Sequence, residues 1–236
     1  MDNSVGGVDE LTLLAELQAA FEESIDAVDA EATVPWCGDW EVSDLVEHLS
    51  DIHHWAAAMA RSTDVERWVG VADPRLRYAT CAAELRTTLE SLDPSAPART
   101  LLEGGTVAFW HRRQLHETLV HLWDLRTAGG LDLVVGPVLW ADTVDEVVTV
   151  MHPRQVRLGR APAPTVRLVL AATDLDRTWS LSAAADAPAA RAATLNGPAE
   201  ALALLLWRRT GLDDPRLSVD GDEVALAAVL ADHFVP

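Results

Sequence analysis

The spacing of apolar residues divides the chain into a helical first part and a mixed second part. Before residue 152, apolar side chains recur every three or four positions, which places them on one face of an α-helix. In residues 8–30 these positions are Leu11, Leu14, Leu17, Phe21, Ile25 and Val28. The pattern predicts further helices over 43–61, 74–92 and 107–128, and a shorter one over 137–151. Four main helices with short links predict a bundle.

The pattern changes after residue 152. Residues 153–164 are rich in proline and arginine and are interpreted as a linker. Residues 165–173 and 177–183 alternate as strands do, and a third strand is predicted over 189–195. A helix over 198–209, a short strand over 217–222 and a helix over 223–234 complete the prediction. The predicted fold class is therefore α plus α+β, with a helical bundle over 1–152 and a small α+β domain over 163–236.

Composition excludes several partners and chemistries. The formal net charge of −19 and the isoelectric point of about 4.6 disfavour binding to nucleic acid or to an anionic membrane. All 18 basic residues are arginine, which excludes Schiff-base and P-loop lysine chemistry. The acidic N-terminal segment has no apolar stretch of a signal peptide, and no uncharged apolar run reaches the roughly 18 residues of a membrane span. We expect a cytoplasmic protein whose two cysteines, Cys37 and Cys81, are reduced.

The helix over 107–128 carries the residues with the clearest chemistry. Glu117 and His121 are four positions apart, so they lie on one face in successive turns and can hold one metal ion. This face lies roughly 140° from the apolar face of the same helix. Trp110 and Gln114 project in the same direction as Glu117 and His121 and are therefore predicted to line a pocket.

A third ligand is predicted on the helix over 43–61. His48 shares the apolar stripe of this helix and is expected to point inward, with Asp44 one turn earlier to orient it. Two histidines and one carboxylate leave coordination positions open, which is typical of a catalytic metal site. Taken singly, these residues also fit simpler interpretations: an exposed pair of helix neighbours for Glu117 and His121, and a hydrogen-bonded core histidine for His48.

Other polar residues of the helix over 107–128 are weaker candidates. Arg112 and Arg113 could bind a substrate carboxylate, although arginines on a helix surface are usually solvated. His111 is expected at the surface; His116 could act as a general base, but packing near Trp123 is the expected role.

Five motifs resemble those of a known family. Residues 40–49 read W-x-V-x-D-L-V-x-H-L, and residues 109–124 read F-W-x-R-R-x-x-H-E-x-x-V-H-x-W-D. Further along, residues 141–147 read A-D-x-x-D-E-V, residues 172–179 read A-T-D-x-x-R-x-W, and residues 197–209 read G-P-A-x-x-L-x-L-x-L-W-x-R. Together they resemble the mycothiol-dependent maleylpyruvate isomerase family, part of the DinB-like metalloenzymes.

The resemblance implies a DinB-like four-helix bundle followed by a sterol-carrier-like α+β domain. It also implies a divalent metal, with zinc expected, on His48, Glu117 and His121, and mycothiol or a similar thiol as cofactor. The implied activity is isomerisation, or thiol S-transfer, of a small α,β-unsaturated acid such as maleylpyruvate, by a monomer or homodimer. The chain departs from the family at two positions. Glu41 stands where a Ser or Thr usually caps the helix, so Ser43 or Asp39 is expected to cap it instead. Arg208 stands in place of a glycine.

Two other functions remain open at this stage. The same three ligands could activate water in a thiol-independent hydrolase or transferase. Alternatively, the chain is a non-enzymatic binding protein that a metal stabilises, which a fourth protein ligand would favour.

Overall fold

The computed structural model describes residues 4–70, 72–164, 167–181, 192–231 and 234–235. The chain forms two compact units, Met1–Val134 and Val135–Pro236. Parts of the predicted elements fall on residues 165–166, 182–183, 189–191 and 232–233, which lie outside the described residues.

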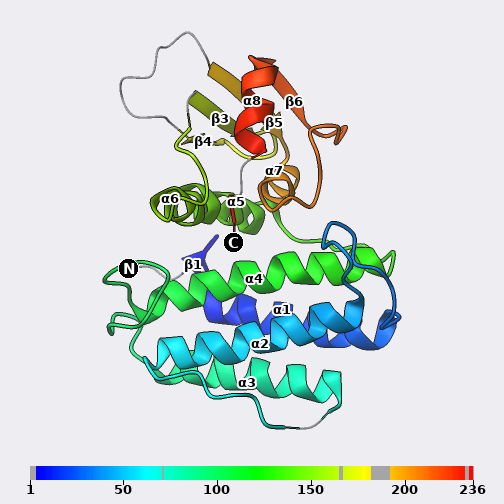
Figure 1. The fold of residues 1–236 in the computed structure, drawn as a ribbon, viewed down its shortest axis with the longest axis vertical. Coiled ribbons are helices and arrows are strands. Elements are labelled where there is room, and N and C mark those ends of the chain that lie inside the picture. The colour runs from blue at the N-terminus through cyan, green and yellow to red at the C-terminus, as the bar shows by residue number, and fades with distance from the viewer. Residues whose placement is uncertain (1–3, 71, 165–166, 182–191, 232–233, 236) are drawn as a thin grey trace. The chain divides into compact units, whose positions relative to one another are not determined.

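The first unit is the predicted helical bundle (Figure 1). A short hairpin of β1 (Ser4–Val5) and β2 (Val8–Asp9) precedes four helices, α1 (Glu10–Ala27), α2 (Val42–Ala60), α3 (Pro74–Ser91) and α4 (Val107–Ala128). Helix α2 packs against α3 and α4, and α1 packs against α4 and α3. Each helix therefore buries its apolar stripe against neighbours, as the sequence pattern requires.

Capping side chains fix where the helices of the bundle begin. Asp9 and Asp73 each accept a hydrogen bond from the backbone three residues later, at the starts of α1 and α3. At α2 the N-cap is Glu41, and the backbone N–H of Glu41 donates a hydrogen bond of 3.0 Å to the Asp44 carboxylate. The expectation that Ser43 or Asp39 would cap α2 is therefore wrong, because Asp44 supplies the reciprocal bond of a capping box.

Large apolar side chains fill the interior of the bundle. The fully buried members include Leu14, Phe21, Leu45, Leu49, Leu85, Leu115 and Leu119. Each such side chain contributes about 1.5–3 kcal/mol through removal of its surface from water. Helix α4 is buried on nearly every side, including most of its polar residues. Polar groups on α4 therefore need partners inside the protein.

The second unit is the predicted α+β domain. Three consecutive helical segments come first, α5 (Pro137–Glu146), the π-helix η1 (Val147–Met151) and α6 (His152–Arg157). A mixed sheet follows, with strands β3 (Arg167–Ala172), β4 (Arg177–Leu181), β5 (Ala192–Gly197) and β6 (Ser218–Gly221) and helices α7 (Ala199–Leu206) and α8 (Glu223–Leu230). The strand order is β4-β3-β5-β6, and only the β3–β5 pair of this sheet is parallel.

Helix α5 belongs to the second unit, where it packs against α7. The boundary between the units lies at residues 134/135, earlier than the boundary at 152 that the sequence predicted. The predicted linker is also partly helical, because Pro153 occupies the first turn of α6, where its missing N–H is tolerated. The His152 ring stacks on Phe234 at 4.7 Å, which ties α6 to the C-terminal segment.

Two of the sequence motifs meet within this unit. Asp145 of α5 accepts hydrogen bonds from Arg177 at 3.0 Å and from the indole N–H of Trp179 at 3.1 Å. The link joins the A-D-x-x-D-E-V and A-T-D-x-x-R-x-W segments. None of the helices in the described ranges combines the length and apolar character that a bilayer crossing requires.

Candidate metal centre

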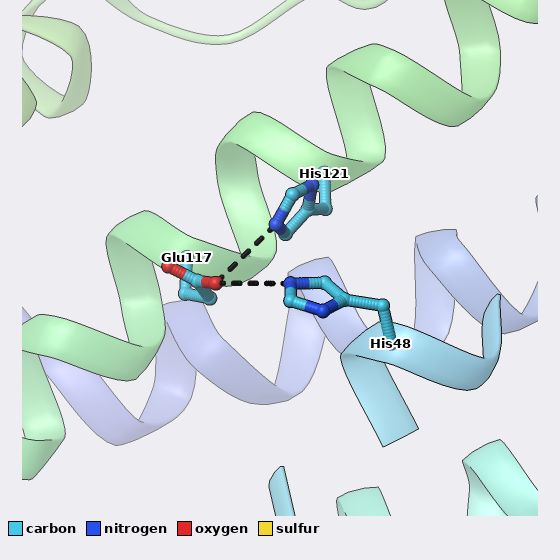
Figure 2. A group of neighbouring side chains, drawn as sticks. All are labelled: His48, Glu117 and His121. Carbon is cyan, nitrogen blue, oxygen red and sulfur yellow. Dashed lines mark ion pairs between the residues drawn. The ribbon is translucent and has the colours of Figure 1, made fainter. Parts of the chain in front are cut away.

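The three predicted metal ligands lie together inside the bundle. Figure 2 shows His48 of α2 facing Glu117 and His121 of α4. The Oε1 atom of Glu117 lies 3.3 Å from Nε2 of His121 and 3.8 Å from Nε2 of His48. The cluster arises because Glu117 and His121 are one turn apart on α4, and α2 packs against that helix.

These positions suit one small divalent cation. With ligand bonds of about 2.0–2.1 Å, neighbouring donor atoms around a tetrahedral zinc lie roughly 3.3 Å apart. One donor atom from each of the three side chains lies within 4.8 Å of the others. Nitrogen and carboxylate donors are also the types that zinc accepts. Within the described ranges no fourth histidine, cysteine or carboxylate joins this group, so coordination positions would stay open.

The cluster has one open side, formed by His48. His121 and Glu117 are only 4% and 8% exposed, whereas the His48 side chain is 32% exposed. The Trp40 ring lies 4.9 Å from the His48 ring and covers part of it. The prediction that His48 points into the core is therefore only partly right, because about a third of its side chain remains exposed.

Asp124 orients His121, one of the candidate ligands. Its Oδ2 lies 2.9 Å from Nδ1 of His121, and the carboxylate is fully buried. This contact leaves Nε2 of His121 directed at the cluster, which is the usual role of a carboxylate behind a metal-binding histidine. Asp124 was not among the predicted site residues, although its position three residues after His121 places it on the same side of α4. Asp44, predicted for this role beside His48, is instead engaged in the cap of α2.

Arg113 lies deeper than expected. The residue is 4% exposed, and its Nη2 atom pairs with Oε2 of Glu117 one turn away. The alternative that this arginine is solvated on the helix surface is therefore wrong, because its guanidinium is buried against the Glu117 carboxylate. Arg112, the neighbouring candidate, is half-buried.

Trp110 and Gln114 are packed in the core of the bundle. Trp110 is fully buried, donates from its indole N–H to the Arg99 carbonyl at 2.8 Å, and packs edge-on against Trp55. The Oε1 atom of Gln114 lies 3.0 Å from Nδ1 of His53. Burial lowers the pKa of His53 to about 4, so this ring is neutral at pH 7. The prediction that Trp110 and Gln114 line the pocket does not match these packed positions.

Two further histidines of α4 are buried. His111 is 3% exposed and His116 is fully buried, so the prediction of a surface His111 is wrong. Burial lowers the pKa of His111, which favours the neutral ring. The physical reason is the central place of α4, which leaves the helix no solvated face at these positions.

The helical bundle and the following α+β unit together define a protein with a DinB-like first unit and a smaller second unit. Family models support this assignment along most of the chain. A model described as the mycothiol maleylpyruvate isomerase N-terminal domain matches residues 11–126, and a model described as the MDMPI C-terminal domain matches residues 139–228. The chain belongs to the mycothiol-dependent maleylpyruvate isomerase family.

Solved structures show the same fold. The crystal structure of the mycothiol-dependent maleylpyruvate isomerase aligns with a TM-score of 0.64 at 13% identity, covering 89% of this chain and 91% of that chain. A variant of that enzyme with one histidine replaced by alanine aligns with a TM-score of 0.62 at 14% identity, with the same coverage. No curated protein sequence is similar enough to match.

Proposed function

We propose that this chain is a metal-dependent enzyme that uses mycothiol, or a similar small thiol, to isomerise a small α,β-unsaturated acid such as maleylpyruvate. The observation that carries the proposal is the convergence of His48, Glu117 and His121 on one point, with His48 partly exposed to solvent. Both units match the domains of a family named for this activity. S-transfer of the thiol to the same class of acid would need the same site.

The protein side chains would hold the ion and set its surroundings. Asp124 holds His121, Arg113 holds Glu117, and His48 supplies the ligand at the open side. A zinc ion on these ligands would supply one piece of chemistry, namely stabilisation of the cofactor thiol as a thiolate at neutral pH. The neighbouring Trp40 ring shields part of this side from water.

The reaction follows from the chemistry of a thiolate and an activated double bond. Addition of the sulfur forms a C–S bond and moves the π electrons onto the conjugated carbonyl group. The former double bond is then single and can rotate. Elimination breaks the C–S bond, restores the double bond in the trans arrangement and returns the thiolate unchanged. If the adduct instead gains a proton and leaves, the net reaction is S-transfer.

The first experiment is metal analysis of purified protein beside two histidine variants. We expect about one zinc per chain in the wild type and in the control His54→Ala, and none in His121→Ala. His54 is a matched control because it lies on α2 and bonds to Glu84, outside the cluster. The zinc-loaded wild type should then convert maleylpyruvate only when thiol is added.

Each other result would favour a different function. Protein that binds no metal after reconstitution would refute the metal centre. Zinc with turnover that needs no thiol would point to a metal hydrolase or transferase. Zinc without turnover, whose removal only lowers the melting temperature, would point to a metal-stabilised binding protein.

A further inference from the structure

The two oxygens of the Glu117 carboxylate have different partners. Oε2 accepts from Nη2 of Arg113, one turn earlier on α4. Oε1 faces the cluster, 3.3 Å from His121 and 3.8 Å from His48. The Arg113 and Glu117 side chains are only 5% and 11% exposed, so the pair is largely shielded from water. The carboxylate is thereby fixed in one orientation before any ion binds.

An oxygen that is held by a guanidinium is a poor ligand for a metal ion. One of its two lone pairs is already engaged in a charge-assisted hydrogen bond, which is roughly twice as strong as a neutral one. The guanidinium would also repel a second cation approaching the same oxygen, and this repulsion is weakly screened where water is excluded. Separating the pair would leave the buried Arg113 charge without this partner.

We propose that Arg113 is a positioning residue that restricts Glu117 to one metal-binding oxygen and thereby keeps coordination positions open for thiol and substrate. The inference rests on the metal-dependent function proposed above. A carboxylate binding through both oxygens would occupy a position that the reaction needs. Arg113 also withdraws negative charge from Glu117, so the ion retains more of its ability to stabilise a thiolate.

Cobalt substitution provides the test, because Co²⁺ takes zinc sites and its visible absorption weakens as the number of ligands rises. The apo forms of the wild type, Arg113→Met and the control Arg126→Met, whose arginine lies on the same helix but bonds to Asp132 and Ser24, are titrated with Co²⁺ and then with 2-mercaptoethanol as the thiol probe. We expect Arg113→Met to bind cobalt at least as tightly as the wild type, with weaker visible bands. It should bind the thiol about tenfold more weakly. Arg126→Met should match the wild type in all three measurements.

The opposite directions of these changes separate positioning from a purely structural role. Loss of packing alone would weaken cobalt binding and leave the band intensity per bound ion unchanged, which would overturn the inference. Wild-type behaviour of Arg113→Met would overturn it as well. A crystal structure of the zinc-loaded wild type tests the same point without relying on the fold of a variant. Oε1 on zinc and Oε2 on Arg113 is the expected arrangement, and both oxygens on zinc would refute it.

The proposed function and this inference fail in distinguishable ways. A wild type that binds neither zinc nor cobalt overturns both. A wild type that binds metal and depends on thiol, with Glu117 bound through both oxygens, overturns only the role of Arg113.

Discussion

Replacement of Asp124 should weaken metal binding in two steps. The carboxylate is fully buried and holds Nδ1 of His121 at 2.9 Å, with the Cys37 sulfur 3.9 Å away. Asp124→Asn keeps an oxygen that can accept from the imidazole but removes the negative charge. Asp124→Ala removes both, so His121 loses its orientation and its nitrogen becomes a weaker donor.

The expected magnitudes follow from the usual effect of such partners on metal affinity. Changes behind a ligand histidine typically reduce affinity about 10- to 100-fold. We expect about tenfold for Asp124→Asn and about 100-fold for Asp124→Ala, or about 1.4 and 2.8 kcal/mol. The larger value agrees with about 1.5–3 kcal/mol for a hydrogen bond to a charged group.

Competition with a chromophoric zinc chelator measures these affinities, and thermal unfolding of the apo forms shows whether each variant folds. Asp64→Asn is the control, because Asp64 lies at the surface with its side chain 97% exposed. A folded Asp124→Ala that binds zinc within twofold of the wild type would refute the assigned role of Asp124.

Three further predictions concern parts of the structure outside the ligand cluster. Because burial lowers the pKa of His53 from 6.5 to about 4, the unfolded chain binds the extra proton between these values, and stability should fall by up to about 3 kcal/mol as the pH drops from 6.5 to 4. Denaturant unfolding at stepped pH should show this slope in the wild type and a flatter one in His53→Gln; equal slopes would contradict it. Trp110→Phe should destabilise the bundle by about 1–3 kcal/mol without changing zinc affinity, since Trp110 is a core residue. Weaker zinc binding at unchanged stability would instead show that Trp110 lines the pocket. Asp145→Ala should lower the free energy of unfolding by about 1–3 kcal/mol, because it leaves the Trp179 N–H without this acceptor. Asp145→Asn should recover part of that loss in calorimetry. An unchanged melting temperature in the alanine variant would count against the interaction.

The four long helices of this protein followed from local signals in its sequence, whereas the β1–β2 hairpin and α6 were not predicted. Helix α4 has the bounds that its apolar spacing and Gly129 predicted, and α3 begins at Pro74 after the cap Asp73. The hydrophobic spacing and capping residues that decide such bounds act over one or two turns, so a single sequence contains them. The domain boundary did not follow, because α5 is assigned by its packing on α7.

The candidate metal centre was likewise determined partly by the sequence and partly by tertiary packing. The sequence determined that Glu117 and His121 share a face of one helix, because that depends only on the helical repeat. Only tertiary packing decided that His48 lies at an open edge, that Arg113 turns to Glu117, and that Asp124 holds His121. Periodicity identifies one buried face of a helix, but α4 has neighbours on several sides and is buried almost all round. Its polar residues must therefore pair within the protein, and their partners depend on contacts between helices that no local pattern records.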